Sequence, residues 1–137
     1  MLEFHQVHKT YTTPQGPLNV LNDVSLRLAA GESLALMGES GSGKSTLLHL
    51  AAGLDLPDQG TISFENQNVA SLPEPTRAKL RREQLGLVFQ QFHLVPSLTV
   101  IDNLRLQARL ANRDDADWTD HLIERLGLSG METRYPE

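Results

Sequence analysis

One fourteen-residue stretch, Met37–Leu50, constrains this chain more than any other. Its sequence is Met-Gly-Glu-Ser-Gly-Ser-Gly-Lys-Ser-Thr-Leu-Leu-His-Leu. Gly38, Gly43, Lys44 and Ser45 fit the pattern G-x-x-x-x-G-K-[ST]. Glycines let the backbone turn tightly and bring its N–H groups close to an anion. A helix that begins after them adds roughly half a positive charge at its N-terminus. The pattern indicates a loop that binds phosphate.

The neighbouring segments match the strand and the helix that this pattern requires. Ser33–Met37 is a short, mostly apolar run after Gly31 and predicts a buried strand. Lys44–Ala52 consists largely of helix formers, and Gly53 stands where a C-terminal cap belongs. The alternative is a glycine-rich turn that matches by chance, at most about one case in twenty. We therefore predict a nucleoside triphosphate site.

Each residue type in the loop has a predicted role. Lys44 reaches the β- and γ-phosphates, the Ser45 hydroxyl ligates Mg²⁺, and Thr46 bonds a phosphate nearer the sugar. A nucleoside triphosphate with Mg²⁺ is therefore the expected ligand. The predicted binding residues of the loop are Gly38, Glu39, Ser40, Gly41, Ser42, Gly43, Lys44, Ser45 and Thr46.

The rest of the chain predicts an antiparallel sheet, one more buried strand and several helices. Leu2–Thr12 and Val20–Leu28 have strand patterns on either side of the turn Pro14–Pro17. Thr99 is a good N-cap with Asp102 three residues on. The other expected elements are a strand at Thr61–Phe64, a loop at Asn66–Leu72, a basic helix at Thr76–Glu83, a buried strand at Leu85–Phe89, a helix through Leu110 and a helix at Asp114–Gly127 with Trp118, Leu122 and Leu126 on one face.

Composition narrows the function classes. The 137 residues form one domain or a piece of one, and the net charge of −5 argues against nucleic-acid binding. The chain has no cysteine, which excludes thiolate metal sites, and the histidines share no metal-ligand spacing. No apolar run approaches the length of a membrane span, and no signal peptide is evident. We expect any membrane association to depend on a partner.

Three residues outside the loop have competing interpretations. Tyr11 could stack on a nucleotide base, but from its position alone a strand tyrosine is favoured. Gln90 ends an apolar strand, where α/β sheets place ligand-facing residues, yet it also fits a solvated loop. Trp118 is expected in the core rather than at a ligand.

The order of these motifs resembles the N-terminal part of an ABC-transporter ATP-binding subunit, of the lipoprotein-releasing and macrolide-exporting type. The likeness rests on Val20–Leu26, Met37–Leu54 and Leu85–Leu104. It implies an α/β fold: a P-loop NTPase core with an N-terminal antiparallel β-subdomain over residues 1–91, and the Q-loop remainder with the start of a helical subdomain over 92–137. It also implies that the cofactors are ATP and Mg²⁺, that Tyr11 stacks on adenine and that Gln90 touches Mg²⁺.

By the same resemblance the chain would work on the cytoplasmic face of the membrane, with a transmembrane permease and a second ATPase subunit, homodimeric or heterodimeric. Lys44 and Gln90 would be its catalytic residues. Three features of the family are missing: the Leu-Ser-Gly-Gly-Gln signature, the Walker B strand ending in Asp-Glu, and the switch histidine. Leu128–Gly130 resembles the start of the signature, but we interpret it as a turn. The chain is therefore expected to stop just short of the signature.

These features allow three alternative hypotheses about the function. The first is a fragment of an ABC-type ATPase that powers export or lipoprotein release, with an incomplete catalytic site and little activity by itself. The second is a nucleotide-binding remnant or regulatory module without turnover. The third is a small-molecule kinase that shares only the phosphate loop, and the sequence shows no acceptor site for it.

Overall fold

The computed structural model describes residues 1–136. It divides into two compact units, Met1–Arg81 and Arg82–Glu137. The predicted division at residues 91 and 92 stays a prediction, and Glu137, the last residue of the predicted second domain, lies outside the described residues.

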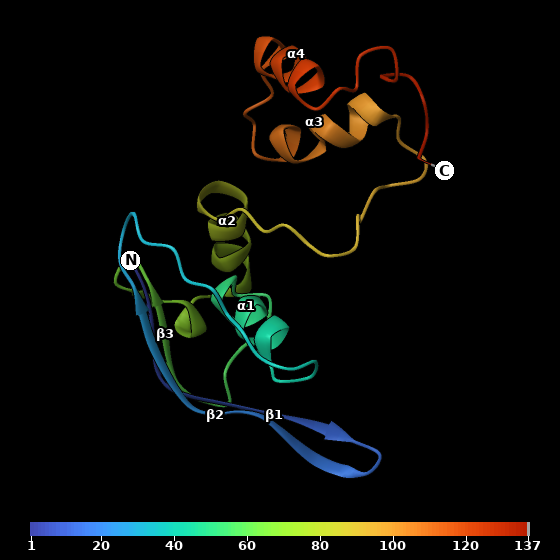
Figure 1. The fold of residues 1–137 in the computed structure, drawn as a ribbon. Helices are drawn as coiled ribbons and strands as arrows, with labels where there is room; N and C mark the ends of the chain where they lie inside the picture. Colours follow the sequence, from blue (N-terminus) through green and yellow to red (C-terminus); the bar gives the residue numbers. More distant parts are fainter. Residues whose placement is uncertain (137) are drawn as a thin grey trace. The chain divides into compact units, whose positions relative to one another are not determined.

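The first unit is built on an antiparallel sheet with the strand order β2-β1-β3-β4 (Figure 1). Thr13 pairs with Gly16, so the first two strands form a tight hairpin, as the proline and glycine cluster between them predicts. Tyr11 pairs with Leu18 near the tip of this hairpin. The strands are β1 (Leu2–Thr13), β2 (Gly16–Leu28), β3 (Gln59–Phe64) and the short β4 (Gln67–Asn68).

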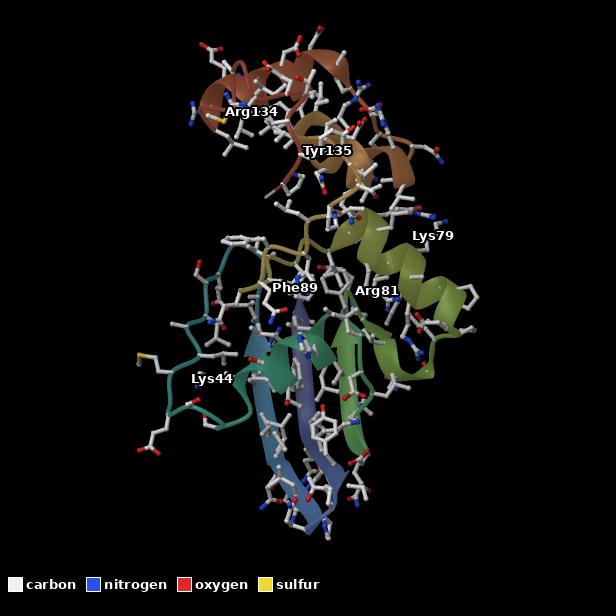
Figure 2. The ribbon with its side chains drawn as sticks, turned by 90° about the vertical axis from the view of Figure 1, so that its right-hand side faces the viewer. Lys44, Lys79, Arg81, Phe89, Arg134 and Tyr135 are labelled. Carbon is white, nitrogen blue, oxygen red and sulfur yellow. The ribbon has the colours of Figure 1, made fainter. Side chains whose placement is uncertain are left out.

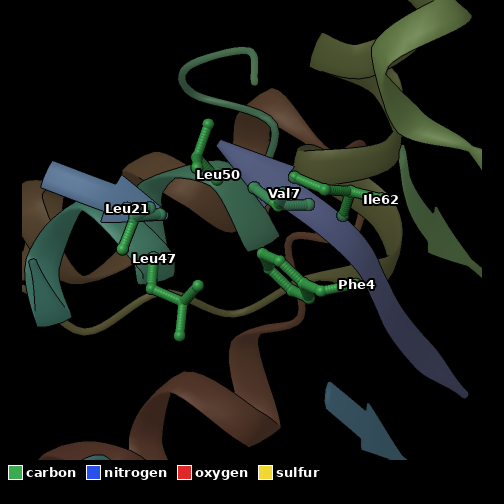
Figure 3. Packing of buried hydrophobic residues seen from close by; sticks show 6 residues of the cluster. All are labelled: Phe4, Val7, Leu21, Leu47, Leu50 and Ile62. Carbon is green, nitrogen blue, oxygen red and sulfur yellow. The ribbon is translucent and has the colours of Figure 1, made fainter. Parts of the chain in front are cut away.

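One helix, α1 (Lys44–Ala51), packs its apolar side on this sheet. Leu47 and Leu50 of the helix cluster with buried side chains of the strands (Figure 3). The helix ends in a Schellman motif, because the N–H groups of Gly53 and Leu54 donate to Leu50 and His49. Gly53 has a φ of 63° there, which confirms the predicted cap. The buried cluster consists of Phe4, Val7, Leu21, Leu47, Leu50 and Ile62.

The remaining helices follow the predicted order. Thr99 caps its helix as expected: its hydroxyl accepts from the Asp102 N–H at 3.3 Å. Arg81 anchors another helix by donating to the Gly53 carbonyl at 2.7 Å. No helix within residues 1–136 is long and apolar enough to cross a membrane. The elements are a 3₁₀ turn η1 (Val69–Ser71), α2 (Glu74–Gln84), α3 (Val100–Leu110) and α4 (Ala116–Arg125). The expected loop at Asn66–Leu72 thus contains β4 and η1.

Two predicted buried strands do not form. Ser33–Met37 and Leu85–Phe89 pair with no strand among the described residues, and Met37 and Val88 are almost fully exposed. An apolar run favours extended backbone, but a strand exists only when a neighbour completes its hydrogen bonds. Residues 1–136 supply no such neighbour to either segment. Both runs have the apolar composition of a buried strand, but the prediction that they form buried strands was wrong.

The buried face of α4 also differs from the prediction. Trp118 and Leu126 are exposed, at 59% and 60%, whereas Thr119 and Ile123 are buried. Trp118 instead lies beside His121, with the ring centroids 5.3 Å apart. The apolar stripe used for the prediction is one residue out of register with the face that packs. The prediction of Trp118 as a core residue was wrong.

Candidate functional site

The loop before α1 needs glycine at two positions for different reasons. Gly43, the N-cap of α1, has a φ of 88°, and a Cβ there would lie 2.9 Å from the Val20 carbonyl oxygen. Gly38 has a φ of 148°, and a Cβ there would lie 2.8 Å from Ser42 Oγ. Both backbone conformations are strained for residues with side chains. The loop therefore takes a path that a side chain at either position would disturb.

Lys44 lies at the junction of the loop and α1 (Figure 2). Its ammonium nitrogen donates to the carbonyl oxygens of Gly38 at 2.9 Å and Glu39 at 2.6 Å. A third bond, of 3.2 Å, goes to Ser42 Oγ. The loop is thus closed around a cation that carries three donors. This places a positive charge beside the backbone of the loop.

The first turn of α1 directs backbone donors to the same place. The first bond of the helix runs from the Leu47 N–H to the Gly43 carbonyl at 2.9 Å. The N–H groups of Lys44, Ser45 and Thr46 precede that bond and have no partner within the helix. No acidic residue lies in this first turn. Helix donors, the helix dipole and the Lys44 ammonium together suit an anion such as phosphate.

The donors for a metal ion are few. Within residues 1–136, no group of three or more His, Cys, Asp or Glu side chains could hold a metal. The Ser45 hydroxyl is exposed in the first turn of α1. A single hydroxyl suits Mg²⁺, which takes one or two protein ligands and completes its shell with phosphate oxygens and water. The chain's chemistry therefore fits Mg²⁺ that arrives with a nucleotide.

Gln90 belongs to the second unit, where it is exposed. Its neighbours Phe89 and His93 form an edge-to-face pair with centroids 4.6 Å apart. The predicted contact of Gln90 with Mg²⁺ stays a prediction.

Tyr11 is anchored by residues that sequence reasoning missed. Its hydroxyl donates to Asp55 Oδ2 at 2.7 Å. The other carboxylate oxygen of Asp55 accepts from Lys9 Nζ at 2.8 Å, and Lys9 also donates to the Leu56 carbonyl at 2.8 Å. The only signal in the sequence was a lysine at position 9, where the inward-facing side of β1 would otherwise continue as apolar.

Burial and this network move three pKa values. Burial raises the pKa of Tyr11, and its hydrogen bond to Asp55 raises it further. Burial alone would raise the pKa of Asp55, but bonds from Lys9 and Tyr11 outweigh it, so that pKa lies below its usual 3.8. Burial opposes the charge on Lys9, yet its pairing with Asp55 leaves that pKa above its usual value. All three groups keep their ordinary charge at neutral pH.

These shifts predict a loss of stability in acid. The pKa of Asp55 is lower in the folded chain than in the unfolded chain, so its contribution is complete above 3.8 and disappears as the pH falls through the folded value. The carboxyls of Glu74, Asp102 and Asp114 also have lowered pKa values because they bond hydroxyl and guanidinium groups. We expect the thermal midpoint to fall as the pH drops from 5 toward 3, and the fall to be shallower in Asp55→Asn. An equal fall in both proteins would contradict the role of Asp55.

A glycine loop closed on a lysine and followed by a helix defines the P-loop class of phosphate-binding proteins. A sequence model of the family described as "ABC transporter" matches residues 21–137. The chain belongs to that family.

Two kinds of curated relative are similar to nearly the whole chain. The lipoprotein-releasing system ATP-binding protein LolD of Acinetobacter baylyi is 38% identical, and the alignment covers 99% of this chain and 61% of that protein. The macrolide export ATP-binding/permease protein MacB of Sodalis glossinidius is also 38% identical, with 99% of this chain and 21% of that protein covered. The chain thus spans about three fifths of the first relative and about one fifth of the second.

Solved structures of ATP-binding cassettes are also similar to this chain. An ATP-binding cassette in a dimeric, post-hydrolysis state with ADP and phosphate matches at a TM-score of 0.88 and 31% identity, covering 99% of this chain and 62% of that one. The dimeric structure of a bacterial ABC transporter cassette matches equally well. The α/β cassette fold predicted from the sequence is confirmed.

Proposed function

We propose that the chain is the nucleotide-binding part of an ABC-transporter ATPase and binds MgATP. The observation that carries this is the loop closed around Lys44 at the N-terminus of α1. Its donors and its positive charge suit the triphosphate, and Ser45 supplies a hydroxyl oxygen for Mg²⁺. The ADP and phosphate named for the matching cassette are consistent with this ligand class.

We further propose that MgATP binding here serves export or lipoprotein release through a membrane permease. The names of the relatives support this, since one releases lipoproteins and the other exports macrolides. A second ATPase subunit is the other proposed partner, because the matching cassettes are dimers. The protein would then act on the cytoplasmic face of the membrane.

For the 137-residue chain by itself we propose binding with little hydrolysis. In ATPases of this class a carboxylate or amide must position the attacking water, while lysine and Mg²⁺ offset the charge that develops. The sequence contains no Asp-Glu pair, and Glu39 and Glu65 follow no strand that would place them as a Walker B glutamate. Steady ATP hydrolysis by the purified chain that is abolished in Lys44→Ala would contradict this part of the proposal.

The binding proposal predicts a large effect of Lys44→Ala. Removing the ammonium group removes a charged hydrogen bond to phosphate, worth about 1.5–3 kcal/mol, so the affinity for MgATP should fall roughly 10- to 150-fold. Calorimetric titration of MgATP into both proteins measures this difference.

Lys79→Ala is the matched control. Lys79 is exposed on α2 and forms no ion pair or hydrogen bond among the described residues, so its removal breaks no contact (Figure 2). It changes the net charge of the chain by the same amount as Lys44→Ala. We expect its affinity to equal that of the parent chain. Equal affinity of the parent and Lys44→Ala, or no saturable binding by the parent, would overturn the proposal.

A further inference from the structure

The turn that follows α1 is fastened to β1 by several polar contacts. Asp55 and Leu56 both accept from Lys9 Nζ at 2.8 Å. Asp58 Oδ2 accepts from the Thr10 N–H at 2.6 Å, and the Asp58 N–H donates to the His8 carbonyl at 3.0 Å. The turn is therefore held at successive residues of one strand. Because α1 leads directly into this turn, the strand and the C-terminal end of the helix have a fixed spacing.

Tyr11 lies at the end of this fastened segment. The residue is 36% exposed, and its hydroxyl donates to Asp55 Oδ2 at 2.7 Å. Lys9 Nζ lies over the ring, 5.1 Å from its centroid. An aromatic side chain on an exposed strand normally rotates about two torsions. Here a hydrogen bond fixes the far end of the ring and a cation occupies one of its faces.

Helix α1 links the ring to the phosphate loop: Lys44 is the first residue of the helix, and Asp55, which bonds the Tyr11 hydroxyl, follows its last residue, Ala51, in the next turn. A helix of eight residues is about 12 Å long. The Thr46 hydroxyl is one of the groups that act on Tyr11: it lowers the pKa, while burial and Asp55 raise it more and leave the pKa of Tyr11 above its usual value. Thr46 is in the first turn of α1, two residues after Lys44. One carboxylate, Asp55, therefore bonds both the buried lysine of β1 and the Tyr11 hydroxyl, in the turn that follows the helix of the phosphate loop.

We propose that Asp55, held by Lys9, is a positioning residue that locks the Tyr11 ring for stacking on the nucleobase. This rests on the proposed binding of ATP. The locked ring offers its free face to the base without losing torsional freedom on binding, and preorganisation of this kind increases affinity. The fastened turn also fixes the distance between the base platform and the phosphate loop. Asp55 acts only through Tyr11 and does not touch phosphate.

The test compares two ligands that differ in the base. ATP needs both the ring and the loop, whereas inorganic tripolyphosphate needs the loop alone. Tyr11→Phe removes only the hydroxyl and keeps the ring, so it leaves the fold undisturbed. We expect it to weaken MgATP about fivefold, the value of one hydrogen bond, and to leave magnesium tripolyphosphate unchanged. Tyr135→Phe changes the chain's other tyrosine, in the second unit, and should alter neither affinity.

Asp55→Ala and the double variant show whether the two residues act together. In the parent background Asp55→Ala should weaken MgATP at least as much as Tyr11→Phe, and in the Tyr11→Phe background it should cause no further loss specific to ATP. Circular dichroism of each variant checks that the sheet is intact.

The possible outcomes distinguish the role of Asp55 from the proposed binding of MgATP. If the parent binds neither ligand, the proposed function fails. If the parent binds both and Tyr11→Phe weakens neither, or weakens both equally, the triphosphate site stands and the role of Asp55 is overturned. Additive losses in the double variant would also overturn it, because the two residues would then act independently.

Discussion

Leu50→Ala is expected to lower the free energy of unfolding of the first unit by about 2–5 kcal/mol. Leu50 is 0% exposed and packs from the buried side of α1 against the sheet. The core it belongs to is a single cluster of six residues, so the cavity left by truncation has few neighbours that could fill it. For a unit of this size the expected change corresponds to a fall in thermal midpoint of roughly 10–30 °C.

Far-UV circular dichroism during urea or thermal unfolding measures this loss. Leu48→Ala removes the same atoms from the same helix at a position that is 50% exposed, and should cost well under half as much. The single tryptophan, Trp118, lies in the second unit, so its fluorescence reports on that unit separately. Equal destabilisation by the two leucine variants would contradict the packing of α1 described above.

This prediction concerns function as well as stability, because α1 supplies the N–H groups of the candidate site. The helix has only eight residues, and a helix of that length is not stable in water by itself. Its packing through Leu47 and Leu50 is what keeps its first turn in place. The core and the phosphate site are therefore linked by a single element.

Local sequence patterns predicted the elements whose structure depends on contacts between neighbouring residues. The hairpin between β1 and β2 follows from alternation around a proline and glycine turn, and α1 follows from helix formers bounded by Gly43 and Gly53. The cap formed by Thr99 follows in the same way. In each case the residues that decide the structure are neighbours in the sequence.

The failures concern contacts between residues far apart in the sequence. Ser33–Met37 has the polarity of a buried strand, but pairing depends on a partner that its own residues cannot specify. Trp118 has helical spacing with Leu122 and Leu126, yet the adjacent stripe through Thr119 and Ile123 is the one that packs. The periodicity predicted the helix correctly, but it did not predict which face of the helix is buried.

The same distinction between local and long-range contacts applies to the candidate site. The spacing of Gly38, Gly43 and Lys44 was enough to place the loop, because its geometry is local. The anchoring of Tyr11 was not visible, since Lys9 and Asp55 are 46 positions apart. Only the folded hairpin and the turn after α1 bring these two charges together.

Gly43→Ala is expected to reduce the affinity for MgATP by roughly 100-fold or more. A methyl group at this position would lie 2.9 Å from the Val20 carbonyl oxygen and 3.0 Å from Leu21 Cδ2. Val20 and Leu21 are fixed in β2 by the sheet, so the loop and the first turn of α1 have to move instead. A charged hydrogen bond to phosphate is worth about 1.5–3 kcal/mol, so the loss of two such bonds when the loop moves lowers the affinity by roughly 100-fold or more.

Gly41→Ala separates contact from backbone strain. Gly41 has a φ of 82°, close to the 88° of Gly43, but a Cβ there would meet no atom within 4 Å. Both variants therefore carry a similar strain of about 1–2 kcal/mol, and only Gly43→Ala adds the collision with β2. Titration calorimetry with MgATP should show a much smaller loss for Gly41→Ala. Equal losses would assign the effect to strain alone, and unchanged binding in Gly43→Ala would show that the N-terminus of α1 does not hold the triphosphate.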